Sequence, residues 1–245
     1  MAKLARSSPR RKNVLSRDRI IEAAIEILDT TGEDGLTVRA LSERLATGAG
    51  AIYWHIGSKG DLLSAACDNI VARTVTTSSS ARATPEAAIR TLALGIFDAI
   101  DAHPWVGSAL SRAPGQLPIV RIAEGIANQV CALGVSDDKK WATVVALLNF
   151  ILGVAGRNAG NGQRSRKRRL KRSSFIEAVS TTWTKLDPIE FPFARSVAGQ
   201  LNAHDDRIDF LAGIDLILSG IASLGRRSKQ DETSRKMTGQ SRGLE

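Results

Sequence analysis

The chain has 245 residues, 43% of them hydrophobic and 24% charged, and its formal net charge is +9. These values are typical of a globular protein with one large domain, or a small domain followed by a larger one. Only 4% of the residues are aromatic, which favours an all-α fold over a β-sandwich or barrel. The two isolated cysteines, Cys67 and Cys131, exclude a disulfide framework and favour a reducing compartment.

The basic residues concentrate in three segments. Residues 1–15 are dense in lysine and arginine, the run 164–172 contains no acidic residue, and the tail 226–245 has a weaker excess. Such charge suits a polyanionic partner such as nucleic acid, but solvated segments also tolerate lysine and arginine. The role of the run 164–172 therefore stays open, and residues 1–15 and 226–245 are predicted to be a disordered arm and tail.

Targeting signals are not recognisable in the sequence. No apolar stretch follows the basic N-terminus, so it does not resemble a signal peptide. The longest apolar run, residues 141–156, contains Asn149 and is shorter than the roughly 20 residues that cross a bilayer. The sequence therefore predicts a soluble, cytoplasmic protein with no membrane partner.

Apolar residues at helical spacing predict a first helix that starts after Ser16 as N-cap and stops at Gly32. Thr37 is a suitable cap for a second helix. The "TGAG" sequence places a break at Gly48 and Gly50, before a short third helix over residues 49–55. The sequence "SKGD" at 58–61 has capping-box spacing and opens a fourth helix.

The rest of the chain keeps a helical period. The predicted helices are 85–102, 104–112, 116–134, 137–158, 173–185 and 205–224, with a loop at 159–172. No long run alternates apolar and polar residues, so the predicted fold class is all-α.

The second and third helices with their tight turn, braced by the first, describe a helix-turn-helix. Ile52 and Ile56 are four residues apart and are predicted to face the core, so at least two of the three residues 53–55 must project outward. Their hydroxyl, indole and imidazole groups can donate to phosphates, as can Lys59 and Thr37 at helix starts. The alternative is that the aromatic residues cover a junction with the rest of the protein.

The stretch "TVRALSERLATGAGAIYWHIGSKGDLL" resembles the DNA-binding domain of the tetracycline-repressor (TetR) family, and the resemblance covers about residues 17–65. The stretch "LDPIEFPFARSVAGQLNAHDDRIDFLAGIDLILSGI" is similar to the C-terminal regulatory domain of the tetracycline repressor subgroup. We therefore expect a DNA-binding domain at 16–65 and a regulatory and dimerisation domain at 66–225.

The resemblance implies a homodimeric repressor that leaves a palindromic operator in double-stranded DNA when a small-molecule effector binds. It implies the following DNA-binding residues: Thr37, Arg39, Thr47, Gly48, Ala49, Ala51, Tyr53, Trp54, His55 and Lys59. Gly48 and Ala51 lack the hydrogen-bonding side chains common at those positions, so apolar contacts, DNA shape and the N-terminal arm would contribute to sequence reading.

For dimerisation, the resemblance implies that the helix 205–224 and the helix containing 141–156 pair with their symmetry mates. The candidate stripe is Phe210, Ile214, Ile217 and Ile221, with Gly213 and Gly220 where backbones could approach closely. A stripe packed inside the chain's own core is the alternative.

The candidate effector residues are polar or amphipathic groups in apolar helices: His103, Trp105, Arg112, Asn149, Arg157 and Asn158. Each also has a purely structural interpretation, such as ending a helix; for Asn149 a buried amide would need a partner. No cofactor or metal site is predicted, and the lack of a convincing histidine pair makes tetracycline a poor candidate effector. Scattered histidines and the absence of a phosphate loop argue against an enzyme, and a non-specific architectural DNA binder is a further alternative.

Overall fold

The computed structural model describes residues 15–78, 83–112, 116–167, 172–203 and 205–241, and side chains within them except at 161–173, 175, 202 and beyond 223. Every regular element in these ranges is helical, which confirms the predicted all-α fold class. The chain divides into two compact units, residues 1–69 and residues 70–245. Residues 1–14, most of the predicted arm, lie outside the described ranges, as do residues 242–245 at the end of the predicted tail.

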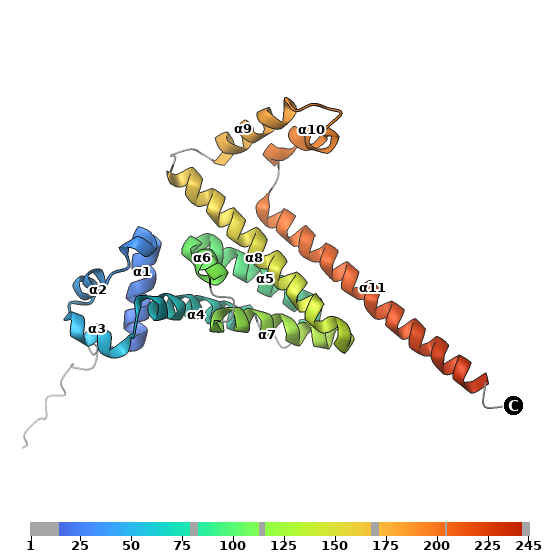
Figure 1. The fold of residues 1–245 in the computed structure, drawn as a ribbon, viewed down its shortest axis with the longest axis horizontal. Coiled ribbons are helices and arrows are strands. Elements are labelled where there is room, and N and C mark those ends of the chain that lie inside the picture. Colours follow the sequence, from blue (N-terminus) through green and yellow to red (C-terminus); the bar gives the residue numbers. More distant parts are fainter. Residues whose placement is uncertain (1–14, 79–82, 113–115, 168–171, 204, 242–245) are drawn as a thin grey trace, which may run out of the picture. The chain divides into compact units, whose positions relative to one another are not determined.

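The first unit is a set of short helices on one small core (Figure 1). The helices are α1 (Arg17–Gly35), α2 (Val38–Leu45), α3 (Ala49–His55) and the first half of α4 (Lys59–Ser78). Three predicted N-terminal caps are present in it. The side-chain oxygens of Ser16, Thr37 and Ser58 accept hydrogen bonds from the backbone N–H three residues further on, at 3.3, 3.1 and 3.1 Å.

Two backbone positions set the turns of the first unit. Gly32 has φ +72° and ψ −170° and interrupts α1 where the sequence predicted its end, although one more helical turn follows to Gly35. The predicted break between α2 and α3 covers residues 46–48, so Gly48 lies in it whereas Gly50 lies within α3. The left-handed residue of the break is Ala46, with φ +50°. The N–H of Thr47 bonds to the Ser42 carbonyl at 3.0 Å, closing a Schellman turn around Ala46.

The second unit is a larger helical bundle. Its elements are the end of α4, α5 (Pro85–Ala102), α6 (Pro104–Arg112), α7 (Leu117–Ala132), α8 (Asp137–Lys167), α9 (Arg172–Thr184), α10 (Pro192–Ala198), the 3-10 helix η1 (Leu201–Ala203) and α11 (Asp206–Ser241). The helices α5 and α6 have the predicted bounds, whereas α10 and η1 were not predicted.

Two helices, α8 and α11, are longer than the sequence predicted. The predicted loop 159–172 is wrong up to Lys167, because α8 continues past the glycines there. Ala159 is buried, so packing against the bundle helps to offset the helix cost of about 1 kcal/mol per glycine. The predicted disordered tail is likewise helical from 226 to Ser241 as part of α11. That segment has no proline and is rich in good helix formers such as Lys, Arg, Gln and Glu.

The core of the second unit forms where α5 and α8 pack against α6, α7 and α11 (Figure 1). Its centre includes a stack of three rings from three helices. Phe210 of α11 is fully buried between Phe97 of α5, with ring centroids 4.8 Å apart, and Phe150 of α8, at 5.8 Å. Such stacked pairs contribute about 0.5–1.5 kcal/mol each beyond their buried area, so they fix α11 on the bundle.

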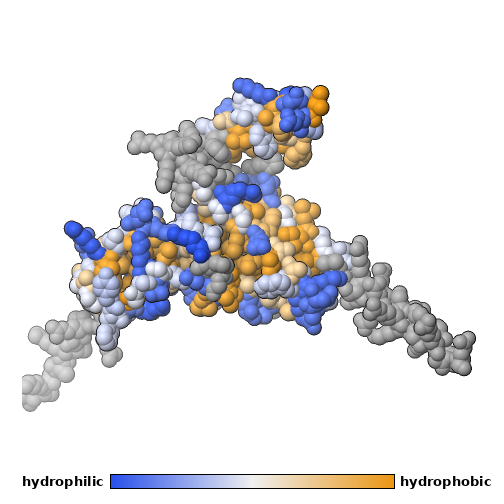
Figure 2. All heavy atoms as spheres, in the orientation of Figure 1, coloured by the Kyte–Doolittle hydropathy of each residue, from blue (hydrophilic) through white to orange (hydrophobic). Residues whose placement is uncertain are grey.

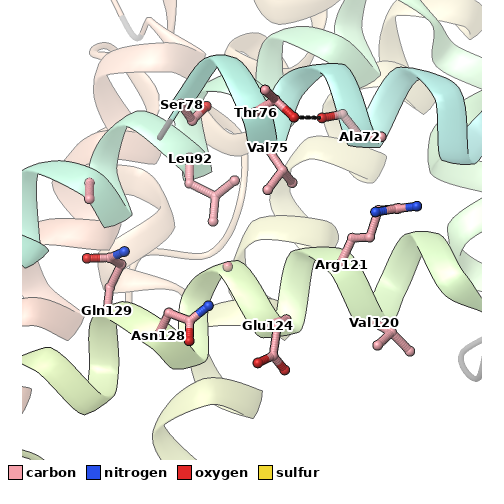
Figure 3. Close-up of a pocket in the computed structure, with 12 residues that line it drawn as sticks. Ala72, Val75, Thr76, Ser78, Leu92, Val120, Arg121, Glu124, Asn128 and Gln129 are labelled. Carbon is pink, nitrogen blue, oxygen red and sulfur yellow. Dashed lines mark hydrogen bonds between the residues drawn. The ribbon is translucent and has the colours of Figure 1, made fainter. Parts of the chain in front are cut away.

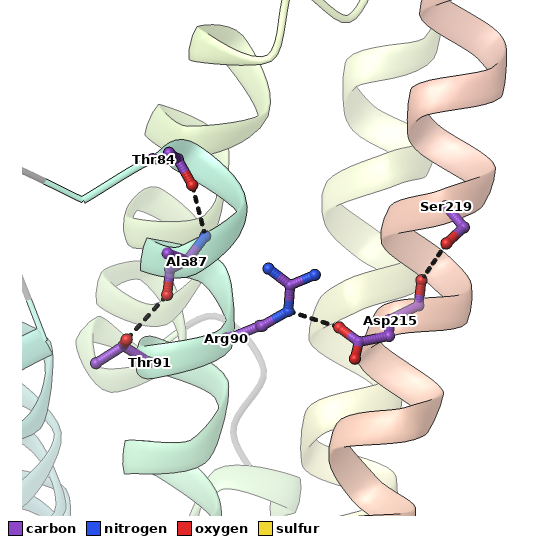
Figure 4. Close-up of polar contacts among 6 residues, drawn as sticks. All are labelled: Thr84, Ala87, Arg90, Thr91, Asp215 and Ser219. Carbon is purple, nitrogen blue, oxygen red and sulfur yellow. Dashed lines mark hydrogen bonds and ion pairs between the residues drawn. The ribbon is translucent and has the colours of Figure 1, made fainter.

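Polar pairs also hold α11 against α5. Arg90 donates to Asp215 at 2.6 Å (Figure 4), and Arg207 pairs with Asp98 at 3.1 Å. The two pairs run in opposite directions along the helices, as an antiparallel packing requires. All four side chains are about half exposed, so each pair contributes less than about 1 kcal/mol and mainly sets the register.

An apolar face of the bundle stays uncovered. Figure 2 shows hydrophobic side chains gathered where α8 and α11 lie. Within the described part of the chain, the α8 segment Asp137–Gly160 has the length and composition of a membrane span, and only a third of its most apolar window is buried. The expectation that no apolar stretch is long enough to cross a bilayer is therefore wrong by length and composition. The core helix of a soluble protein can have the same length and composition.

Candidate nucleic-acid interface and ligand cavity

Helix α3 divides its surface between core and solvent. Ile52 and Ile56 are 1% and 7% exposed, whereas Tyr53 and Trp54 are 60% and 86% exposed. Ile52 and Ile56 therefore face the core, as their spacing predicted. The exposed tyrosine and tryptophan present a phenol and an indole on a helix of only seven residues, an arrangement suited to a partner surface.

Three candidate phosphate ligands lie together. Thr37, Tyr53 and Lys59 all line one small apolar hollow of about 30 Å³ in the first unit, although they come from three different elements. Thr37 precedes α2 and Lys59 begins α4, so each stands where backbone N–H groups favour an anion. The Lys59 ammonium donates to the carbonyl oxygen of Glu33 at 2.6 Å. The structure therefore brings Thr37, Tyr53 and Lys59 to one small area of the first unit.

The remaining predicted DNA-binding residues surround α3. Arg39 is exposed and donates to Glu43 at 2.9 Å, and this hydrogen bond and the carboxylate charge raise the pKa of Arg39 above its usual value. The residues at the start of α3, Gly48, Ala49 and Ala51, are exposed, whereas Thr47 and His55 are partly buried. Gly48 is the N-cap of α3 and provides no side-chain hydrogen bond. Small exposed groups at this end leave room for close approach of another surface.

A cavity of about 600 Å³ lies in the second unit between α4, α5 and α7 (Figure 3). It is lined by Ala72, Val75, Thr76, Ser78, Ala88, Leu92, Val120, Arg121, Glu124, Gly125, Asn128 and Gln129. The volume falls within the range of about 300–1,000 Å³ that is usual for small-molecule sites. The sequence analysis missed this site, because a polar face on α7 has the same period whether it faces a cavity or solvent.

None of the six predicted effector residues lines this cavity. Trp105 is buried in the core and packs edge-on against His103, the C-cap of α5, at 6.3 Å. Arg112 is exposed and donates back to the Ser108 carbonyl. Asn149, like Arg157, is exposed, so the expected buried amide is not found; Asn158 is partly buried. Of the six residues, which belong to α5, α6 and α8, the structure brings His103 and Trp105 into contact with each other.

The predicted dimer stripe is mostly internal. Phe210, Ile214 and Ile221 are buried in the chain's own core, and Ile217 is half-buried. Gly213 also serves an internal contact, because a Cβ there would lie 2.2 Å from the Phe150 ring. Phe210, Ile214 and Ile221 therefore agree with the alternative of a core stripe, while dimerisation through α11 stays a prediction. Helical periodicity identified a buried face but could not show which partner buries it.

A small helix-turn-helix unit joined to a larger helical unit is typical of a class of DNA-binding regulators. The comparison with family models agrees with this class. Residues 20–66 match bacterial regulatory proteins of the tetR family, and residues 81–224 match the tetracyclin repressor-like C-terminal domain. The chain belongs to the TetR family of transcription regulators, and the resemblance seen in the sequence is confirmed.

Individual relatives resemble the chain over most of its length. An HTH-type transcriptional regulator of Saccharopolyspora erythraea is 28% identical over 220 residues, which cover 87% of each chain. The transcriptional regulator SCO7222, a TetR from Streptomyces coelicolor, has 48% identity and a TM-score of 0.79, covering 86% of this chain and all of that one. The Streptomyces coelicolor TetR family protein ActR, in complex with actinorhodin, has 22% identity and a TM-score of 0.69, covering 86% of this chain and 99% of that one.

Proposed function

We propose that this protein is a homodimeric transcriptional repressor that binds a palindromic operator through α3 and leaves it when a small molecule occupies the α4–α5–α7 cavity. The observation that carries the proposal is the exposed pair Tyr53 and Trp54 beside the Thr37–Lys59 cluster. Because the family consists of bacterial transcription regulators, we place the protein in the cytoplasm.

On the proposed DNA complex, α3 enters the major groove with its N-terminal end toward the bases. Thr47, Gly48, Ala49 and Ala51 would face base edges, and small residues there permit close approach. Tyr53, Trp54 and His55 would contact the DNA backbone or a thymine methyl, and Arg39 would reach a phosphate nearby. The hydroxyl of Thr37 and the ammonium of Lys59 would hold phosphates on either side of the groove.

A second copy of the chain is the proposed cover for the uncovered face of α8 and α11. Exposed residues at helical spacing on α8 include Ala142, Ala146, Asn149 and Gly153, a row of small side chains that permits close helix packing. Among the described side chains of α11, Ile208 and Leu216 are large, hydrophobic and exposed, at 68% and 76%. This interface replaces the stripe that the sequence analysis favoured. Dimerisation would bring two copies of α3 to two half-sites, since one helix-turn-helix reads too short a sequence for a specific operator.

The effector part of the proposal depends on the cavity volume and on its position next to α4. Helix α4 starts in the DNA-binding unit and its last turns line the cavity through Ala72, Val75 and Thr76. A ligand that prefers one position of α4 would shift the population of DNA-binding conformations by its difference in affinity for the two states. The complex of ActR with actinorhodin is a precedent for ligand binding in a distant relative of the same fold.

The experiment is selection of duplexes from a random library with the purified protein, followed by binding titrations at several salt concentrations. We expect a palindromic consensus. Lys59→Ala should weaken binding to every duplex and lower the salt slope by about 1, as loss of one phosphate contact does. Lys185→Ala, an exposed lysine of the second unit, is the matched control.

Variation of Thr47 tests sequence reading separately. Thr47→Val should change which duplexes are preferred rather than weaken all of them equally, because base contacts specify and phosphate contacts position. Recovery of no consensus, with equal binding to all duplexes, would favour the non-specific architectural binder and refute the proposed function.

A further inference from the structure

The α4–α5–α7 cavity has walls of two different characters. Val75 of α4 and Leu92 of α5 point into it from one side (Figure 3), and Ala88 adds to this apolar wall. The opposite wall is the polar face of α7, where Arg121, Asn128 and Gln129 occur at helical spacing. A molecule that fits between these walls must be apolar along one side and able to hydrogen-bond along the other.

The charges of the described lining residues are few and separated. Arg121 and Glu124 are the two ionisable lining groups, one turn apart on α7. In Figure 3 the guanidinium of Arg121 extends from α7 toward α4, whereas the carboxylate of Glu124 extends from the side of α7 away from α4. Arg121 therefore presents its cation on the α4 side of α7, where an anionic group of a ligand is favoured.

The amides mark the other end of the same wall. Gln129 is eight residues after Arg121 in α7, which corresponds to about 12 Å along the helix. The Gln129 side chain extends toward α4 and α5 in Figure 3, and Asn128 lies beside it. Amide groups both donate and accept hydrogen bonds, so they suit a neutral polar group such as a hydroxyl or carbonyl. None of the described lining residues is aromatic, so they offer aliphatic contact rather than ring stacking.

We propose that the effector is an elongated amphipathic organic acid, whose anionic group pairs with Arg121 and whose neutral polar end is bound by Asn128 and Gln129, with its apolar body on Val75 and Leu92. This inference depends on the proposed function, because it names the chemical class of the effector. The pair formed by the ligand's anionic group and the Arg121 guanidinium orients the ligand, and the aliphatic wall buries most of the ligand's surface.

The test uses three rigid two-ring probes: 6-hydroxy-2-naphthoate, 2-naphthoate and 6-hydroxy-2-naphthamide. The first carries an anionic group and a hydroxyl at opposite ends, and each of the others lacks one feature. In isothermal titration calorimetry on the full chain at low salt, 6-hydroxy-2-naphthoate should bind most tightly of the three. The neutral amide should bind about tenfold more weakly, the usual effect of losing one charge-assisted hydrogen bond.

Variants assign the effect to the cavity. Arg121→Gln should abolish the preference for the acid over the amide, and Arg121→Lys should retain part of it. Arg112→Gln is the matched control, since Arg112 is exposed at the end of α6 and does not line the cavity. Gln129→Leu should remove the advantage of the hydroxyl without changing the preference for the acid. Equal melting temperatures of the variants exclude a folding defect.

The inference is overturned if the acid and amide bind equally, if Arg121→Gln changes the preference no more than Arg112→Gln does, or if none of the probes binds. These calorimetric results do not depend on DNA. If the probes bind as expected but no duplex is selected, the ligand class stands and the proposed function fails. If an operator is selected but the affinity for the acid does not depend on Arg121, the proposed function stands and the ligand class fails.

Discussion

Replacement of Gly213 by alanine tests how closely α11 packs on α8. An added Cβ would lie 2.2 Å from Cζ of Phe150, so the ring must move by about 1.5 Å to reach an ordinary contact of 3.5–4.0 Å. This movement disturbs the stack of Phe150 on Phe210. Crowding of about 1 kcal/mol and the loss of about 1 kcal/mol of ring contact outweigh the helix gain of about 1 kcal/mol. We therefore expect Gly213→Ala to lower the free energy of unfolding by about 1 kcal/mol.

The matched control is Gly220→Ala on the same helix, where a Cβ would meet nothing within 4 Å. At a concentration low enough to keep the chain monomeric, so that no second copy covers Gly220, this variant should raise stability by up to about 1 kcal/mol, which corresponds to about 2–4 °C in melting temperature for a unit of this size. Thermal unfolding followed by circular dichroism, at one fixed protein concentration, separates the two variants. The concentration must be fixed because dimerisation shifts the apparent stability.

A double-mutant cycle identifies the contact. In a Phe150→Ala background, Gly213→Ala should no longer destabilise and should become neutral or stabilising, because the ring that crowds the new methyl is gone. If Gly213→Ala behaves like Gly220→Ala in the wild-type background, or if its cost persists without the ring, the described packing of α11 on α8 is wrong.

Three further predictions concern the first unit and the cysteines. Burial, and to a smaller extent the charge of Asp68, raises the pKa of the Cys67 thiol to about 12. Because the thiolate is the reactive form, iodoacetamide at pH 8 should modify the exposed Cys131 and leave Cys67 intact until the chain unfolds. Mass spectrometry after brief labelling checks this. Gly32→Ala should destabilise the first unit by about 1–3 kcal/mol, because its φ and ψ are essentially restricted to glycine; unchanged chemical denaturation would contradict this backbone argument. Glu43→Gln should strengthen binding to duplex DNA at low salt by releasing the Arg39 guanidinium from its carboxylate, and an unchanged affinity would show that Arg39 does not approach a phosphate.

The local features of the fold could be predicted because short-range chemistry determines them. Ser16, Thr37 and Ser58 cap helices since their hydroxyls reach the N–H three residues on. The spacing of Ile52 and Ile56 fixed which side of α3 faces the core. At the turn between α2 and α3, however, the left-handed residue is Ala46 although glycines stand nearby. A Schellman hydrogen bond determines that conformation, and the sequence does not show where this bond closes.

The long-range features could not be predicted from periodicity. The stripe that includes Phe210 and Ile214 has the same spacing whether a second copy or the chain's own α5 and α8 covers it. The polar face of α7 that includes Arg121 and Gln129 is also typical of a solvent-facing surface, and only the packing of α4 and α5 places a cavity there. The sequence pattern therefore points only to isolated polar residues such as Asn149, which is exposed.

Site-directed cleavage of bound DNA tests most directly whether two copies of α3 lie in the groove. A cleavage reagent attached to Ala51→Cys, in a Cys131→Ser background, reports which nucleotides lie next to the start of α3. We predict strand breaks at two positions related by two-fold symmetry, separated by about one helical turn of DNA or a multiple of it. Breaks spread evenly along every duplex, or none at all from a chain that still binds DNA, would contradict the account.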